Sequence, residues 1–221
     1  MMSDRMNNKR ADSVSVGAMS RAPRGPTVVF DIGWVLLHLT PGPMLNWLSS
    51  AGVSHQGLED IWARIALEDH ESGRLDGAGL LDNLVRLAGD GQRELAQRYW
   101  LDMFDYQHEM FALARRLRQR YRVFLLSNVG DLHWAHLNER FRIADIADDM
   151  LPSFQAGIMK PHAEIYRQAE QRFDLDPAQT VFIDDRADNI EAVQRRGWHG
   201  IVHRTSSATI AELQRLGYLT D

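Results

Sequence analysis

Short runs of consecutive apolar residues alternate along this chain with longer segments in which apolar residues recur at helical spacing. A strand buried on both faces of a sheet has such an unbroken apolar run, whereas an amphipathic helix has a period of about 3.6 residues. Their alternation is typical of an α/β fold, in which helices cover a parallel sheet. The predicted strands are Thr27–Phe30, Arg122–Leu126, Met150–Pro152, Thr180–Ile183 and Gly200–Val202. The predicted helices are Glu109–Arg120, Leu132–Arg140, Glu164–Phe173, Ala187–Arg196 and Ile210–Leu216.

One connection is far longer than this fold requires. About ninety residues separate the first predicted strand from the second, whereas a crossover between parallel strands needs about a dozen. Apolar residues at helical spacing, interrupted by glycines, predict an inserted all-helical cap subdomain at residues 43–106. The α/β core domain then comprises residues 27–42 and 107–221. Residues 1–26 are polar and punctuated by Gly, Ser and Pro, which predicts a flexible N-terminal tail.

The composition narrows the classes of function. The chain has 221 residues, of which 44% are hydrophobic and 25% charged, as in an ordinary globular protein. It contains no cysteine, which excludes thiol nucleophiles, disulfides and iron–sulfur clusters. A net charge of −5 argues against nucleic acid as a partner. No apolar run is long enough for a signal peptide or a membrane helix, so we expect a cytoplasmic protein that acts on a small molecule.

Polar side chains stand where the predicted strands end or the next helix begins. In an open parallel α/β sheet, ligands bind beyond the carboxyl ends of the strands. Carboxylates from two strand ends make the kind of oxygen site that Mg²⁺ prefers, and a lysine with hydroxyl and amide donors neutralises a phosphoryl group. An aspartate in such a site can attack phosphorus and form an aspartyl-phosphate that water later hydrolyses. The polar residues are Asp31, Ser127, Asn128, Lys160, Asp184 and Asp185.

The motifs D-I-G, S-N, K-P and D-D-x-x-D, in this order and at these separations, resemble those of the haloacid dehalogenase (HAD) superfamily. The helical insertion after the first motif resembles its small helical cap. The segments ALEDHESGRL, LLSNVGDLH, MKPHAEIY and FIDDRADNIEA are most similar to those of bacterial α-D-glucose-1-phosphate phosphatases. The resemblance extends from Thr27 to Leu216. It implies a Rossmann-like core and a Mg²⁺-dependent phosphoric monoester hydrolase, with a sugar phosphate as the expected substrate.

The resemblance also implies the residues of a metal site. Asp31 matches the family nucleophile, which is also a Mg²⁺ ligand. The backbone carbonyl of Gly33 and the carboxylate of Asp185 match further metal ligands. Asp184 either binds the metal directly or holds a metal-bound water.

The remaining motif residues match contacts to the phosphate and to the metal ligands. Ser127 and the amide of Asn128 match phosphate contacts. Lys160 matches the catalytic cation that lies between the nucleophile and the phosphate, so it is expected both to bind substrate and to assist the reaction. Asp188 matches an acid that lies behind the metal ligands.

One position departs from the family pattern. Most phosphatases of the superfamily have a second aspartate two residues after the nucleophile, which protonates the leaving oxygen, but this chain has Gly33. Loss of a general acid costs about 10²- to 10⁴-fold in rate. We hypothesise that Asp69, His70 or Glu71, a cluster of titratable residues ahead of a glycine in the cap, approaches the leaving group instead.

Two other functions fit parts of the sequence. A 2-haloacid dehalogenase also uses an aspartate nucleophile and lacks the second aspartate, but it needs no metal, whereas Asp184 and Asp185 favour a metal site. A phosphometabolite-binding protein with weakened catalysis would account for Gly33 and for Trp34, which replaces an asparagine of the similar phosphatases. The chain is expected to be a monomer or a homodimer.

Overall fold

A five-stranded parallel sheet forms the centre of the protein, in the order β5-β4-β1-β6-β7. The computed structural model describes residues 25–89 and 93–219, so residues 1–24 of the predicted tail lie outside the described residues. The sheet and its flanking helices confirm the predicted α/β fold. The strands are β1 Thr27–Phe30, β4 Arg122–Ser127, β5 Asp149–Pro152, β6 Thr180–Asp184 and β7 His199–Val202.

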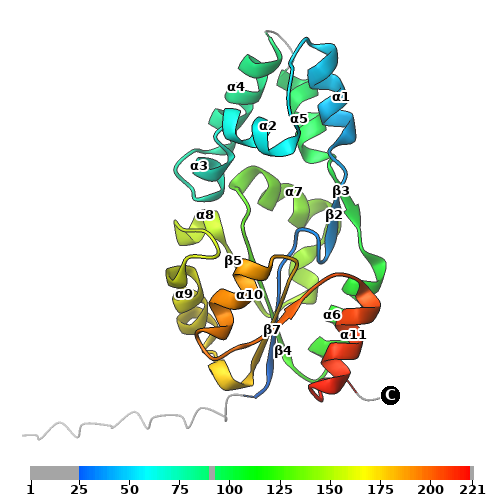
Figure 1. Cartoon of the computed structure of the whole chain (residues 1–221), viewed down its shortest axis with the longest axis vertical. Coiled ribbons are helices and arrows are strands. Elements are labelled where there is room, and N and C mark those ends of the chain that lie inside the picture. Colours follow the sequence, from blue (N-terminus) through cyan, green and yellow to red (C-terminus); the bar gives the residue numbers. More distant parts are fainter. Residues whose placement is uncertain (1–24, 90–92, 220–221) are drawn as a thin grey trace, which may run out of the picture.

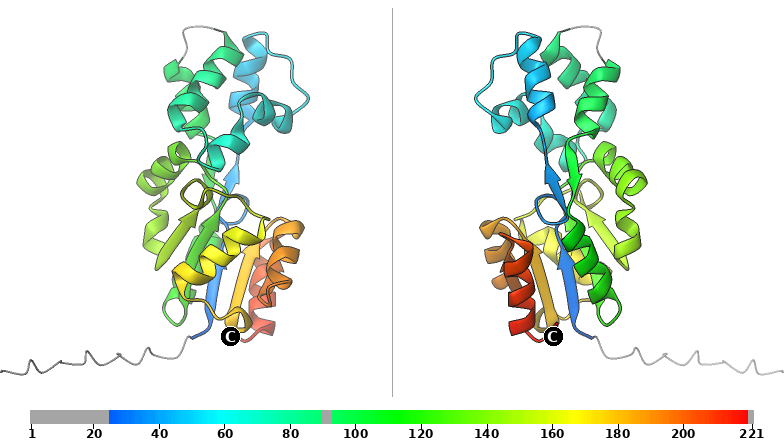
Figure 2. Two further views of the ribbon diagram at one scale, coloured as in Figure 1. Left: turned by 90° about the vertical axis from the view of Figure 1, so that its left-hand side faces the viewer. Right: turned by 90° about the vertical axis from the view of Figure 1, so that its right-hand side faces the viewer.

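The central strand β1 is buried along its whole length because helices cover both faces of the sheet (Figure 2). Side chains of a strand point alternately to opposite faces. Val28 and Phe30 therefore join one hydrophobic cluster, together with residues of the helices α6 (His108–Arg118) and α11 (Ser206–Arg215). Val29 joins another cluster, with residues of α9 (Ala163–Phe173) and α10 (Ala187–Gln194). Full burial of each such side chain contributes about 1.5–3 kcal/mol. Burial on both faces explains the unbroken apolar run in the sequence.

Helices connect the strands of the core. The helix α11 begins at Ser206, four residues before its predicted start, because the Thr205 side chain accepts a hydrogen bond from the backbone N–H of Ala208 and caps the helix. Among the described residues, no helix is long and apolar enough to cross a membrane. The core helices are α6 His108–Arg118, α7 Asp131–Phe141, η1 Ile143–Ile146, α8 Ser153–Ala156, α9 Ala163–Phe173, η2 Pro177–Gln179, α10 Ala187–Gln194 and α11 Ser206–Arg215.

A group of helices from the long connection lies beyond one end of the sheet and forms the cap (Figure 1). Two short antiparallel strands, β2 Leu37–Leu39 and β3 Phe104–Tyr106, join the cap to the core. The strand β3 falls within residues 43–106, which the sequence analysis assigned entirely to helices. Each strand has three residues, too few for a period to be recognised. The cap helices are α1 Gly42–Ser50, α2 Leu58–Arg64, α3 Leu67–Glu71, α4 Gly77–Ala88 and α5 Arg93–Leu101.

Candidate active site

The carboxyl ends of β4, β1 and β6 bring three of the predicted site residues together. These strands are hydrogen-bonded neighbours, with β1 in the middle. Asp31 directly follows β1, Ser127 is the last residue of β4, and Asp184 is the last residue of β6. The backbone N–H of Asp31 donates to the carbonyl of Ile183 at 2.9 Å, which holds the start of the next loop against β6. The parallel sheet thus places the three side chains at a single edge.

The ammonium group of Lys160 lies between two carboxylates. Its Nζ atom is 2.9 Å from Oδ2 of Asp31 and 2.7 Å from Oδ2 of Asp184, and all three side chains are buried. Burial lowers the pKa of Lys160, but the attraction of Asp184 and Asp31 outweighs burial, and the pKa is raised. Burial raises the pKa of Asp31 to about 7, against the attraction of Lys160. Lys160 is therefore a fixed cation beside Asp31.

The side chain of Asn128 holds Lys160 in place. Its Oδ1 atom accepts a hydrogen bond from the backbone N–H of Lys160 at 2.8 Å, and its Nδ2 atom donates to the Lys160 carbonyl at 3.0 Å. The Ser127 side chain lowers the pKa of Asp31 and so favours the charged carboxylate, against the larger effect of burial. Contacts of Ser127 and Asn128 with a phosphate stay predictions, but the structure adds a positioning role for Asn128.

Three carboxylates converge beside the lysine. Asp31, Asp184 and Asp185 each offer an oxygen, and these oxygens lie within 4.8 Å of one another. Lys160 offsets only one of the three charges. Burial raises the pKa of Asp185, and the charge of Asp184 adds to this effect. Because oxygen ligands with an excess of negative charge suit a hard divalent cation, the residues present fit Mg²⁺.

Asn189, rather than Asp188, supports the Asp184 carboxylate. The Asn189 Nδ2 atom donates to both carboxylate oxygens, at 2.9 and 3.0 Å, and the backbone N–H of Arg186 donates to Oδ1 at 2.9 Å. Asp188 instead pairs with the Arg186 guanidinium at 2.8 Å and is half-exposed. Sequence reasoning predicted a supporting acid at Asp188 and missed Asn189. The sequence did contain a signal for this role, because Asn189 follows Asp188 directly and its amide lies in the first turn of α10.

Of the three cap residues proposed as proton donors, Glu71 lines the cavity that also contains Asp31. Asp69 is exposed and pairs with Arg74 at 2.7 Å, and His70 is buried without lining the cavity. Burial raises the pKa of Glu71 to about 7, and the charge of Asp31 adds to this effect. Glu71 is therefore protonated below about pH 7, the state in which a carboxyl group donates a proton.

Contacts with the core fix the position of α3, which carries Glu71 at its end. The Ser153 Oγ atom donates a hydrogen bond to the backbone carbonyl of Glu71 at 2.5 Å. The His70 ring lies so close to Gly130 that a methyl group on this glycine would overlap the ring. The cap is thus held against the core beside the site itself.

A cavity of about 660 Å³ separates the cap from the carboxyl edge of the sheet. Asp31, Ser127, Lys160 and Asp185 line it from the core, and Glu71 lines it from the cap. This volume is within the range of small-molecule sites, about 300–1,000 Å³. The arrangement therefore places the Asp31 carboxylate, the Lys160 ammonium group, a candidate metal site and the Glu71 carboxyl group around one space.

A buried aspartate beside a fixed ammonium and further carboxylates is the arrangement expected of a hydrolase with an aspartate nucleophile. The chain belongs to the haloacid dehalogenase-like hydrolase family, which it matches over residues 27–197. Membership confirms the superfamily predicted from the four motifs. The particular similarity to α-D-glucose-1-phosphate phosphatases stays a prediction.

Two curated relatives are similar along most of the chain. The sesquiterpene phosphatase astK of Aspergillus oryzae is 27% identical over 191 residues, which cover 85% of this chain and 94% of that protein. The D-ribitol-5-phosphate phosphatase of Bacteroides thetaiotaomicron is 26% identical over 183 residues, which cover 77% of this chain and 88% of that protein.

Solved structures share the fold. A HAD-family enzyme of Bacteroides thetaiotaomicron, in complex with magnesium and inorganic phosphate, is 22% identical and superposes with a TM-score of 0.71 over 81% of this chain and 94% of that one. A predicted HAD-like family hydrolase of Porphyromonas gingivalis is 26% identical, with a TM-score of 0.72 over 89% of this chain and 99% of that one.

Proposed function

We propose that this hydrolase is a Mg²⁺-dependent phosphatase that hydrolyses a small phosphorylated metabolite through an aspartyl-phosphate on Asp31. The observation that carries the proposal is the position of Asp31, which is paired with Lys160 and also belongs to the cluster of three carboxylates. A 2-haloacid dehalogenase needs no metal, so the cluster of three carboxylates favours a phosphatase, which must neutralise the charge on phosphoryl oxygens. The curated relatives named above are both phosphatases, which supports the same reaction.

The chain offers residues that would hold Mg²⁺. These are the carboxylates of Asp31 and Asp185 and the backbone carbonyl of Gly33. Asp184 is already bonded to Lys160, Asn189 and the Arg186 backbone, which favours the role of holding a metal-bound water. When bound, Mg²⁺ would neutralise negative charge on the phosphoryl oxygens. A solved HAD-family enzyme of the same fold is in complex with magnesium and inorganic phosphate, and this supports the choice of metal.

The reaction divides into two steps. In the first step an oxygen of Asp31 attacks phosphorus, the bond between phosphorus and the alcohol oxygen breaks, and Glu71 gives its proton to that oxygen. Lys160 offsets the charge on the phosphoryl group while its backbone is held by Asn128. In the second step the Glu71 carboxylate takes a proton from water, which attacks phosphorus and releases inorganic phosphate. Asp31 and Glu71 return to their starting states.

The names of the relatives leave the alcohol part of the substrate open, since one refers to a sesquiterpene and the other to the polyol ribitol. The sugar phosphate predicted from the sequence is one candidate. Monomer or homodimer and a cytoplasmic location stay predictions as well.

The experiment that tests the proposed reaction is phosphate release from a panel of small phosphoesters, with Mg²⁺ and with a chelator. Asp31→Asn keeps the size of the side chain and removes the nucleophile, so we expect it to lower turnover by about 10³-fold or more. Asp105→Asn is the matched control, because Asp105 is exposed on β3 and lies outside both the carboxylate cluster and the cavity lining. Release that persists in Asp31→Asn or in chelator would contradict the proposal. Chloride release from 2-chloropropionate would favour the dehalogenase.

A further inference from the structure

The walls of the active-site cavity separate into a charged end and an apolar end. The charged end belongs to the core and contains Asp31, Lys160 and Asp185. The cap segment 58–106 supplies eight of the lining residues, of which six are apolar and two are glutamates. None of these eight is an amide or a hydroxyl side chain. The polar groups that these eight side chains offer are the two carboxylates and the indole N–H groups of Trp62 and Trp100. Hydroxyl groups of a polyol or sugar that faced the apolar side chains instead would be buried without partners, which is costly.

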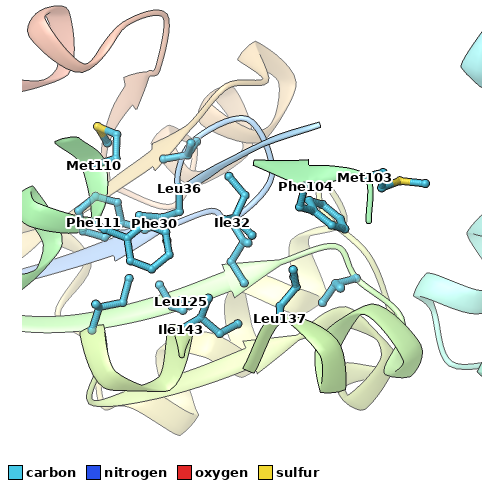
Figure 3. Close-up of a cluster of buried hydrophobic side chains, with 14 of the residues drawn as sticks. Phe30, Ile32, Leu36, Met103, Phe104, Met110, Phe111, Leu125, Leu137 and Ile143 are labelled. Atoms are coloured by element: carbon cyan, nitrogen blue, oxygen red, sulfur yellow. The ribbon is translucent and has the colours of Figure 1, made fainter. Parts of the chain in front are cut away.

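The deep part of the apolar end is formed by buried side chains. Trp100, Phe104 and Leu137 line the cavity, with exposed fractions of 1%, 7% and 1%. Figure 3 shows Phe104 and Leu137 together with Ile32, which lines the cavity too. Because other parts of the protein cover these side chains almost completely, they back the apolar end, and the apolar surface open to a substrate belongs to the more exposed lining residues Trp34, Trp62 and Leu67.

The lining residue His133 has a polar ring, but it leaves the deep part of the cavity largely apolar. Its ring stacks on Trp100, with centroids 4.4 Å apart, and Phe104 meets its edge at 4.8 Å. Its Nε2 atom donates to the Trp100 carbonyl at 2.8 Å, so this hydrogen-bonding atom is already used. Burial lowers the pKa of His133 to about 3, and the ring is neutral at physiological pH. His133 therefore acts mainly as a flat, uncharged part of the wall.

An exposed aromatic residue continues the wall to the cavity mouth. Trp34 lines the cavity, and 43% of its surface is exposed. Among the residues that the structure describes, no other large hydrophobic residue is classed as exposed. The Trp34 φ angle of 59° lies in the left-handed region, which is unfavourable for a bulky side chain. Trp62 and Leu67 line the same cavity from the cap. A strained backbone that holds an indole at the entrance is consistent with a functional role for Trp34.

From this lining we propose that the substrate is the phosphate ester of an apolar alcohol, with a hydrocarbon chain that lies along the wall formed by Trp34, Trp62 and Leu67. The proposal rests on the proposed phosphatase function, because the phosphate at the charged end fixes the direction of the chain. It differs from the sugar phosphate that the resemblance implied.

The test is a series of n-alkyl phosphates from ethyl to octyl, together with ribitol 5-phosphate as the polyol that matches pentyl phosphate in chain length. We expect kcat/KM to rise about fourfold with each methylene that becomes buried, and pentyl phosphate to exceed ribitol 5-phosphate. If kcat/KM did not rise with chain length, or if it were higher for ribitol 5-phosphate than for pentyl phosphate, the proposal of an apolar substrate would be wrong. The proposed phosphatase function would still stand.

A binding measurement separates this inference from the proposed reaction. Asp31→Asn, which cannot form the aspartyl-phosphate, is heated with Mg²⁺ and either ethylphosphonate or octylphosphonate. A larger rise in Tm with octylphosphonate supports the apolar site even if no ester is hydrolysed by the native protein. Equal shifts overturn it.

Two variants test whether the apolar lining residues cause the preference for long alkyl chains. Trp34→Asn removes the indole and suits a left-handed backbone, and Leu67→Gln places an amide in the apolar end. Both are expected to lower kcat/KM for octyl phosphate by about tenfold and to leave ethyl phosphate nearly unchanged. Leu87→Gln is the matched control, because Leu87 is a partly buried cap leucine away from the cavity. Equal losses for octyl and ethyl phosphate would overturn the assignment.

Discussion

The Ser153 hydroxyl donates a 2.5 Å hydrogen bond to the backbone carbonyl of Glu71, a residue 82 positions away in the sequence. The donor lies at the start of α8 in the core, and the acceptor is the last residue of α3 in the cap. A contact to the main chain fixes the backbone of Glu71 and leaves its carboxyl group available to the cavity. This contact holds a cap residue at the cavity of the candidate active site.

Glu71→Gln should lower the rate of alkyl phosphate hydrolysis by about 10²- to 10⁴-fold, because the leaving alkoxide loses its proton donor. The loss should be much smaller for 4-nitrophenyl phosphate, whose leaving group needs no proton. In the native protein kcat for alkyl esters should fall as the pH rises through about 7, where Glu71 loses its proton. This fall should be absent in Glu71→Gln. The measurement is the pH profile of kcat for both substrates.

Glu68→Gln is the control for this prediction, since Glu68 also lines the cavity but its side chain is 83% exposed. We expect a pH profile like that of the native protein. An equal loss in the two variants, or a loss in Glu71→Gln that does not depend on the leaving group, would contradict the role of Glu71 as a proton donor.

Gly33→Asp should partly rescue Glu71→Gln. A Cβ atom at position 33 would meet only Leu39 Cδ1, at an ordinary 3.7 Å, so the backbone leaves room for a side chain. The added carboxyl group would lie two residues after the nucleophile and could protonate the leaving oxygen, which should restore at least about tenfold in alkyl phosphate turnover. Gly33→Asn has a similar size but no acidic proton, and it should restore nothing. Equal rescue by both variants would show that space, not proton transfer, limits the reaction.

Gly130→Ala should slow the enzyme although Gly130 carries no functional group. The added methyl group would overlap the His70 ring and displace α3, and with it Glu71. A shift of about 1 Å in a catalytic group can cost about 10²-fold in rate. Because the effect acts through Glu71, Gly130→Ala should add little to Glu71→Gln in the double variant. Gly42→Ala, in the cap with open space around its Cβ, should be nearly neutral. If the losses of rate in Gly130→Ala and Glu71→Gln were fully additive, the effect of Gly130→Ala would not act through Glu71.

His133 should make the protein sensitive to acid. Its pKa in the folded state is about 3, below the usual 6.5, so the unfolded chain binds a proton that the folded protein does not. The free energy of unfolding should be unaffected by this group above about pH 6.5 and fall between about pH 6.5 and 3, by at most about 1.4 kcal/mol per pH unit. His133→Gln should reduce this slope, measured by urea unfolding. The exposed His199→Gln should not, and an unchanged slope in His133→Gln would contradict the prediction.

The core could be predicted from the sequence because its signals are local. A strand such as Thr27–Phe30 is marked by its own apolar run, and Asp31, Ser127 and Asp184 are marked by following such runs. Once the strands are parallel neighbours, their carboxyl ends have to meet, and the three side chains converge without further information.

The rest of the site depends on contacts between distant segments. The choice of Glu71 over Asp69 and His70 follows from the docking of α3 on Ser153 and Gly130, which no spacing in the cap reveals. Asn189 was missed because an amide at a helix start is ordinary in sequence, whereas its bonds to Asp184 exist only in the folded chain. The apolar end of the cavity is likewise built from α2, α5 and α7 together.

The pair of strands β2 and β3 has a mechanical consequence for the cap. Both chain connections between cap and core run side by side through this narrow ribbon, and α3 lies on the other side of the cap in Figure 1. A rotation of the cap about the ribbon would move α3 through a longer arc than the helices next to the ribbon. In such a rotation the ribbon would be the hinge, and Glu71 would lie far from it. The Ser153 hydrogen bond restrains the cap at the end opposite to this hinge.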